Sequence, residues 1–193
     1  MTLALINLGY GNLGSVGLAF ERLGVTPVVT EDPETIRGAD HVVLPGVGAA
    51  GFAMDRIKAL QLRPVLAGLT QPLLGICLGM QLLFERSEEG GIDCLGLLPG
   101  QVRKLEPSEG RPVPHMGWTR LTVSQEDIGL TTGDYVYFAH SYACDDGPHT
   151  AASVNYGREI PAAVRSGNLW GAQFHPEKSA APGRRFLEAF LAA

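Results

Sequence analysis

Short apolar runs alternate with helix-like patterns along the first half of the chain. Four runs rich in Val, Ile and Leu predict strands, at residues 3–8, 25–30, 41–46 and 72–76. Apolar positions at helical spacing predict helices over residues 13–23 and 51–68, and again from Leu78. Apolar strands that alternate with helices are typical of a parallel sheet covered on both faces. In such a sheet the functional site is expected at the carboxyl ends of the strands.

The pattern changes after Leu95. Short strand-like segments separated by turn residues follow, at 102–105, 120–123, 135–142, 150–156 and 162–167, and they predict hairpins and meanders added to the parallel sheet. A further strand is expected within 168–177 and an amphipathic helix over 184–193. No repeat or linker interrupts this order. We therefore expect an α/β fold in a single domain, residues 1–193, with a mostly parallel central sheet flanked by helices and with added antiparallel strands.

Composition and charge exclude several classes of protein. The net charge of −5 over 193 residues gives no basic surface for nucleic acid. Three cysteines without CxxC spacing argue against a zinc site or a disulfide framework, so no metal is expected. No apolar run is long enough to cross a membrane, and the first residues lack the basic region of a signal peptide. A cytoplasmic protein is the resulting expectation.

Cys77 is the first candidate for chemistry. It stands between Gly75 and Gly79, where a predicted strand ends and a predicted helix begins. This is the pattern of a nucleophile elbow, in which small residues two positions away leave room for a sharp turn. A helix N-terminus favours a thiolate, so Cys77 is a candidate nucleophile. The alternative is a buried structural cysteine at the start of a helix.

A thiol nucleophile needs a base and a group that orients the base. His175 ends the last predicted strand, and Pro176 favours extended geometry there, so Glu177 can turn back toward the imidazole. Taken alone, these residues could form an ordinary surface turn. Backbone N–H groups of the 44–48 loop, at Gly46 and Val47, together with that of Leu78, are candidate oxyanion donors.

The N-terminal glycines leave a different function open. Residues 9–14 have the spacing GxGxxG between a strand and a helix, and Glu31 and Asp32 follow the second strand. This pattern is typical of dinucleotide-binding folds. It leaves little chain for a substrate domain and does not account for Cys77, His175 and Glu177.

Several motifs together resemble the class I, or triad, glutamine amidotransferases, in particular the glutaminase subunit of imidazole glycerol phosphate synthase. They are PGVG at 45–48, GICLGMQ at 75–81, FHPE at 174–177, YGNLGSV at 10–16, SEEG at 87–90, PHMGW at 114–118 and YFAHSY at 137–142. The resemblance extends from end to end. Asn7 and Gly14 depart from it, because many relatives have an Asp and a basic residue at these positions.

The resemblance implies hydrolysis of L-glutamine through Cys77, His175 and Glu177, without a cofactor. It also implies a heterodimer with a (β/α)₈ cyclase that uses the ammonia to make imidazole glycerol phosphate for histidine synthesis. Four residues are then expected to bind glutamine: Gln81, Glu89, Ser141 and Tyr142. Four others are expected to face the partner: Asn12, Met116, Trp118 and Lys178, with Met116 and Trp118 in an exposed loop. Cys94, Cys144, His41 and His149 are expected to be structural or solvent-facing.

Overall fold

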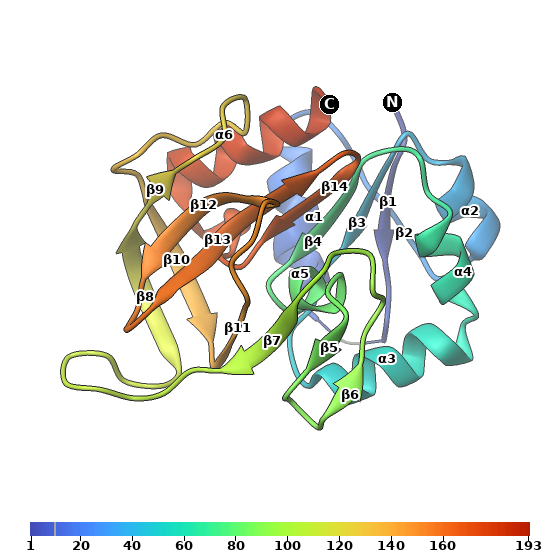
Figure 1. The fold of residues 1–193 in the computed structure, drawn as a ribbon. Helices are drawn as coiled ribbons and strands as arrows, with labels where there is room; N and C mark the ends of the chain where they lie inside the picture. The colour runs from blue at the N-terminus through green and yellow to red at the C-terminus, as the bar shows by residue number, and fades with distance from the viewer. Residues whose placement is uncertain (10) are drawn as a thin grey trace.

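An eight-stranded sheet lies at the centre of the computed structural model, which describes residues 1–9 and 11–193 (Figure 1). Its order is β2 (Val28–Thr30), β1 (Leu3–Ile6), β3 (His41–Leu44), β4 (Leu73–Ile76), β14 (Leu169–Ala172), β13 (Glu159–Ser166), β12 (Thr150–Asn155) and β9 (Thr122–Val123). Neighbours from β2 to β14 pair in parallel, and those from β14 to β9 pair antiparallel. The expected α/β fold class, with antiparallel strands added to a parallel sheet, is confirmed.

Other short strands form two separate sheets. One contains β8 (His115–Arg120) and β10 (Tyr135–His140), and the other contains β11 (Tyr142–Cys144), β7 (Gln101–Lys104), β5 (Arg86–Ser87) and β6 (Ile92–Asp93). The apolar run 135–142 was expected as one strand, but it divides at Ser141 and contributes to both sheets. This division brings the end of β10 and the start of β11 to one place.

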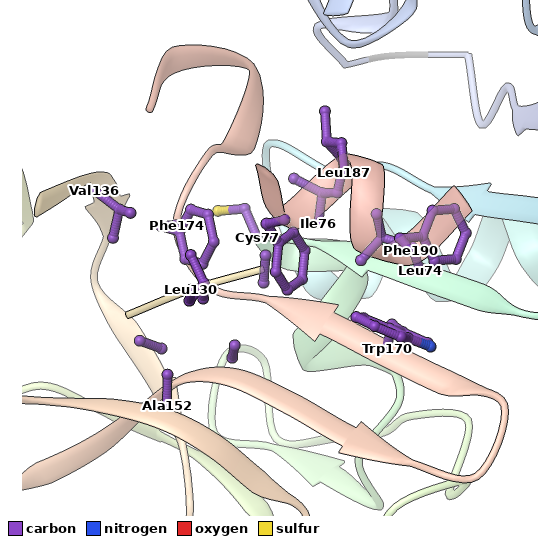
Figure 2. Close-up of a cluster of buried hydrophobic side chains, with 14 of the residues drawn as sticks. Leu74, Ile76, Cys77, Leu130, Val136, Ala152, Trp170, Phe174, Leu187 and Phe190 are labelled. Carbon is purple, nitrogen blue, oxygen red and sulfur yellow. The ribbon is translucent and has the colours of Figure 1, made fainter. Parts of the chain in front are cut away.

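Helices cover both faces of the central sheet. One face packs on α1 (Leu13–Glu21) and α6 (Ala180–Leu191), and the other on α2 (Pro33–Gly38), α3 (Ala50–Ala59), α4 (Leu62–Ala67) and α5 (Leu78–Leu82). Side chains alternate along β1, so Leu3 and Leu5 join one buried cluster and Ala4 and Ile6 join the other. Figure 2 shows part of the first cluster, which includes both Cys77 and Phe174. Two-sided burial explains why these strands are apolar throughout.

One continuous helix was expected over 51–68, and this prediction is wrong in one respect. The segment forms two helices, α3 and α4. The chain turns at Gln61, which adopts a left-handed φ of 55°. Pro64 has no N–H and is tolerated in the first turn of a helix but not in its interior, so a new helix starts just before it. Helix α2 was not expected at all. It begins after Asp32, whose carboxylate accepts a hydrogen bond from the Thr35 N–H at 2.8 Å.

Among the described residues, no helix is long and apolar enough to cross a membrane. The same part of the chain contains no group of three or more His, Cys, Asp or Glu side chains that could hold a metal ion.

Candidate active site

Cys77 occupies a strained turn between β4 and α5. Its backbone has φ 52° and ψ −108°, a conformation that non-glycine residues rarely adopt. Glycines on either side make this turn possible through close packing. A Cβ on Gly79 would lie 1.9 Å from the Leu44 oxygen, and one on Gly75 would lie 2.6 Å from Gly79 backbone atoms. The expected elbow is therefore present, and it is wedged against the end of β3.

The Cys77 thiol is almost buried but has polar neighbours. The Cys77 residue is 6% exposed. Gln173 Nε2 donates to Cys77 Sγ at 3.8 Å, and the Ala139 carbonyl lies 3.9 Å from the sulfur. The other two cysteines differ, because burial raises the pKa of Cys94 to about 11 and raises that of Cys144 as well. Both are buried without a comparable polar setting and fit the expected structural role.

His175 and Glu177 form a buried pair at the end of β14. His175 Nδ1 lies 2.9 Å from Glu177 Oε1, and their side chains are 6% and 2% exposed. His175 is extended, with φ −99° and ψ 99°, and the short 3₁₀ helix η1 (Pro176–Lys178) turns the carboxylate back toward the ring. Ser179 Oγ donates to the His175 carbonyl at 2.7 Å and fixes this turn.

The proton affinity of His175 is high. Burial alone lowers its pKa, but interactions with Cys77 and Glu177 outweigh burial and raise the pKa to about 9. Because Glu177 engages Nδ1, the Nε2 side of the ring remains for the thiol. Strands β4 and β14 are parallel neighbours, so Cys77 and His175 follow strand ends at the same edge. The charged imidazolium can therefore stabilise a thiolate beside it.

A cavity of about 320 Å³ opens onto Cys77. Its walls contain six of the seven residues expected for glutamine or oxyanion binding: Val47, Leu78, Gln81, Glu89, Ser141 and Tyr142. Gly46 packs behind the wall, where an added Cβ would meet Leu78 Cβ at 2.8 Å. Gly48, Pro114, Met116, Ala139 and His140 complete the lining. The structure thus brings together residues from α5, β8, β10, β11 and the loop after β3 around one thiol.

Two of the expected binding residues also hold the cavity wall in place. Gln81 Nε2 donates to the Tyr142 carbonyl at 2.8 Å and to Gln173 Oε1 at 3.0 Å. Glu89 Oε2 accepts a hydrogen bond from the Ala50 N–H at 2.8 Å, at the start of α3. Glu89 is thus fixed in place rather than simply solvated.

The four residues expected at a partner surface are placed unequally. Met116 and Trp118 are exposed, 62% and 51%, but the exposed loop expected for them is wrong because both lie on strand β8. Trp118 and Lys178 both approach Tyr137. The ring centroids of Trp118 and Tyr137 are 6.1 Å apart, and the Lys178 ammonium lies 5.6 Å from the centroid of the Tyr137 ring. Asn12 is the residue directly before α1 and is half-buried.

The dinucleotide alternative finds no support at the acidic pair. Asp32 caps α2, and Glu31 forms an ion pair with Arg56 at 3.4 Å. Asn7 Oδ1 accepts from the Gly9 N–H at 2.8 Å, so this departure from the family pattern closes a local turn. Tyr10, part of the quoted 10–16 motif, lies outside the described residues.

Sequence reasoning missed Gln173 and His140. Gln173 precedes His175 by two positions, a spacing that places both on one side of an extended segment, and this was an available signal. His140 directly precedes Ser141, but no sequence pattern indicates that its ring lines the cavity.

Comparison with known proteins shows the family to which the chain belongs. The family "glutamine amidotransferase class-I" matches residues 12–193. Imidazole glycerol phosphate synthase subunit HisH of Xanthomonas campestris pv. campestris is 51% identical over 192 residues, covering 98% of this chain and 96% of that protein. The subunit of the same name from Idiomarina loihiensis is 46% identical, with 99% and 97% covered.

Solved structures share the fold at lower identity. A crystal structure of a glutamine amidotransferase superposes with a TM-score of 0.77 at 22% identity, covering 98% of this chain and 99% of the other. PurLQS from Thermotoga maritima gives 0.72 at 22% identity, with 99% and 98% covered. From the matched family and the two HisH relatives, the chain belongs to the class-I glutamine amidotransferases, among the HisH subunits of imidazole glycerol phosphate synthase.

Proposed function

We propose that this chain is the glutaminase subunit of imidazole glycerol phosphate synthase. It hydrolyses L-glutamine to glutamate and ammonia through a thioester on Cys77, with His175 and Glu177 completing the triad. The observation that carries the assignment is the strained Cys77 at one strand end with the buried His175–Glu177 pair at the neighbouring one. All 193 residues serve as one glutamine amidotransferase domain, and no metal or cofactor takes part.

The first half-reaction begins from a thiolate and an imidazolium. The raised pKa of His175 keeps the ring protonated at neutral pH. Cys77 sulfur attacks the side-chain amide carbon of glutamine, and the carbonyl oxygen becomes an oxyanion. His175 gives its proton to the departing nitrogen, the C–N bond breaks, and ammonia leaves a γ-glutamyl thioester on Cys77.

Water completes the second half-reaction. Neutral His175 removes a proton from the attacking water, the thioester C–S bond breaks, and glutamate leaves with thiolate and imidazolium restored. Glu177 holds the ring by Nδ1 and stabilises its charge in both steps without itself exchanging a proton.

The cavity residues supply the binding part of the mechanism. Backbone N–H groups of Val47 and Leu78, at the Gly46 loop and the start of α5, donate to the oxyanion. Ser141 and Tyr142 bind the backbone of glutamine, Gln81 contacts it, and Glu89 holds its α-amino group. A volume of about 320 Å³ is within the range of small-molecule sites.

The partner is a (β/α)₈ cyclase that receives the ammonia and forms imidazole glycerol phosphate and aminoimidazole carboxamide ribotide. Asn12, Met116, Trp118 and Lys178 face this subunit in the heterodimer. The exposed Met116 and Trp118 are the kind of side chain enriched at protein interfaces. The complex acts in histidine biosynthesis in the cytoplasm and requires neither nucleic acid nor a membrane.

Replacing the nucleophile tests the assignment. In the complex with the cyclase, Cys77→Ala should abolish product formation from glutamine but retain product formation from ammonium salts, because the second reaction belongs to the partner. Cys94→Ala is the matched control, since Cys94 is equally buried but lies outside the cavity lining. It should keep glutamine-dependent turnover. Glutaminase activity in Cys77→Ala would refute the assignment.

Covalent labelling gives an independent measurement. A chloroketone analogue of glutamine should alkylate Cys77 and spare Cys94 and Cys144, both of which have a raised thiol pKa. Mass mapping of the adduct identifies the labelled residue. An adduct on either control cysteine with Cys77 unmodified contradicts the proposal.

A further inference from the structure

Two buried histidines, of which His140 lines the cavity, form a continuous chain of hydrogen bonds that the proposed mechanism does not use. His115 Nε2 lies 2.8 Å from Thr119 Oγ1, and His115 Nδ1 lies 3.0 Å from His140 Nε2. His140 Nδ1 then lies 2.7 Å from the Tyr142 carbonyl oxygen. The chain thus starts on strand β8 and ends on the segment that closes the glutamine cavity.

With both rings neutral, the direction of every bond in this chain follows from its last member. A carbonyl oxygen only accepts, so His140 donates through Nδ1 and its Nε2 carries a lone pair. That lone pair requires a donor, so His115 Nδ1 carries a proton and His115 Nε2 accepts. Thr119 then donates through its hydroxyl. Reversing any one bond would leave two donors or two acceptors facing each other.

The rings have little freedom to leave this arrangement. His115 is stacked between Tyr156 and Phe138, with ring centroids 3.9 Å and 4.7 Å away. Burial lowers the pKa of His115 to about 4 and that of His140 to about 3, so both rings are neutral at physiological pH, as the direction of the chain requires.

The Tyr142 carbonyl connects this chain to the nucleophile. It accepts from Gln81 Nε2 at 2.8 Å as well as from His140. Gln81 also donates to Gln173 Oε1, and Gln173 Nε2 donates to Cys77 Sγ. Both ring nitrogens of His140 are occupied by protein partners, so His140 acts on the cavity through Tyr142 rather than through a free nitrogen.

We propose that His115 and His140 are positioning residues that hold the Ser141–Tyr142 segment in the geometry that binds glutamine, through a hydrogen-bond chain anchored at Thr119. This rests on the proposed function, because Ser141 and Tyr142 are assigned to glutamine there. Strand β8 therefore has two roles. Its outer face exposes Met116 and Trp118, and its inner face holds the first half of the chain.

Paired variants of His140 test the proposal in the complex with the cyclase. In His140→Asn the amide nitrogen occupies about the position of Nδ1 and still donates to the Tyr142 carbonyl, whereas His140→Leu has a similar shape and no donor. His140→Leu should raise the KM for glutamine about 10-fold and change kcat less than about 3-fold. His140→Asn should raise KM less, about 3-fold, because the bond to the Tyr142 carbonyl remains while the bond to His115 is lost.

Thr119 gives a second pair that leaves the histidines in place. Thr119→Val removes the hydroxyl at nearly constant shape and should raise the KM for glutamine about 3-fold, while Thr119→Ser should restore it. His149→Phe is the control for a merely structural effect, because His149 is buried against Phe84 with ring centroids 5.1 Å apart and does not line the cavity. It should alter the melting temperature without altering KM.

Three results would overturn the proposal: an unchanged KM in both His140→Leu and Thr119→Val, equal increases in KM for His140→Asn and His140→Leu, or failure of Thr119→Ser to restore KM. If His140→Leu does not fold, the Thr119 pair decides.

Nitrogen-15 NMR of the histidine rings tests the chain without any variant. His115 and His140 should each show a proton on Nδ1 and none on Nε2 at neutral pH. A proton on either Nε2 contradicts the proposal. This readout remains valid if the wild-type complex shows no glutaminase activity, the result that would reject the proposed function instead.

Discussion

Gly79 is the tightest point of the nucleophile elbow, so Gly79→Ala should disturb both stability and catalysis. The added Cβ would lie 1.9 Å from the Leu44 oxygen and 2.9 Å from the Leu44 carbonyl carbon, both below any normal contact distance. Strand β3 and helix α5 must then separate by roughly 1 Å. Overpacking of this severity against backbone costs about 3 kcal/mol, which corresponds to a loss of about 6–12 °C in melting temperature for a chain of this length.

The same displacement reaches the oxyanion loop. Leu44 pairs with Gly75 in the sheet, and the loop that contains Gly46 follows it directly. Moving Leu44 therefore shifts the candidate donor at Val47. Loss of one oxyanion donor lowers turnover by ~10²–10³-fold. Thermal melting followed by circular dichroism measures the first effect, and glutaminase turnover in the complex, assayed well below the melting temperature, measures the second.

Gly17→Ala is the matched control. Gly17 lies inside helix α1, and a Cβ there would meet nothing within 4 Å. Alanine is favoured over glycine in a helix interior by roughly 0.5–1 kcal/mol, so this variant should melt slightly higher and keep full turnover. If Gly79→Ala had the same melting temperature as Gly17→Ala and turned over glutamine at the wild-type rate, the proposed close packing at the elbow would be wrong.

The remaining predictions concern the triad and the partner. His175→Ala should lower glutaminase turnover by at least ~10²–10⁴-fold, and Glu177→Gln should lower it less, because only His175 transfers protons; a larger loss in Glu177→Gln would contradict an orienting role. The pKa of His175 is raised from 6.5 to about 9, so its stabilising contribution, roughly 3 kcal/mol, is complete below pH 6.5 and is lost as the pH rises through 9. The free energy of unfolding in urea should therefore fall more between pH 6 and pH 9.5 in the wild type than in His175→Gln. Equal decreases in the two proteins would refute this coupling between His175 protonation and stability. Glutaminase turnover should increase when the cyclase is added and again with its nucleotide ligand, because docking favours an oxyanion loop at Gly46–Gly48 that donates to the substrate; equal turnover in all three conditions would exclude such a switch.

The sequence predicted best what is buried on both sides. Strands β1, β3 and β4 are found where continuous apolar runs occur, since both faces of a parallel sheet need apolar residues. One-sided strands were harder to recognise. Strand β8 alternates buried and exposed residues, and the Pro and Gly around Met116 and Trp118 suggested a loop instead.

The difference between local signals and distant contacts also explains which site residues could be predicted from the sequence. Cys77 directly follows β4 and His175 comes three residues after the end of β14, which is a signal within a few residues. Gln173 acquires its place through Cys77, which lies 96 residues earlier in the chain, and His140 through a carbonyl and a second histidine. Such roles depend on which segments the tertiary fold brings together, and no periodicity records that.

The position of β14 inside the sheet has a consequence for the order of assembly during synthesis. This strand lies between β4 and β13, and its Leu169 pairs with Leu73 of β4. The ribosome synthesises β4 long before β14. Until β14 arrives, β4 is an unpaired edge and Cys77 has no histidine beside it. Under the proposed mechanism, a nascent chain therefore carries the nucleophile without its histidine, and the capacity to release ammonia appears only when the sheet closes.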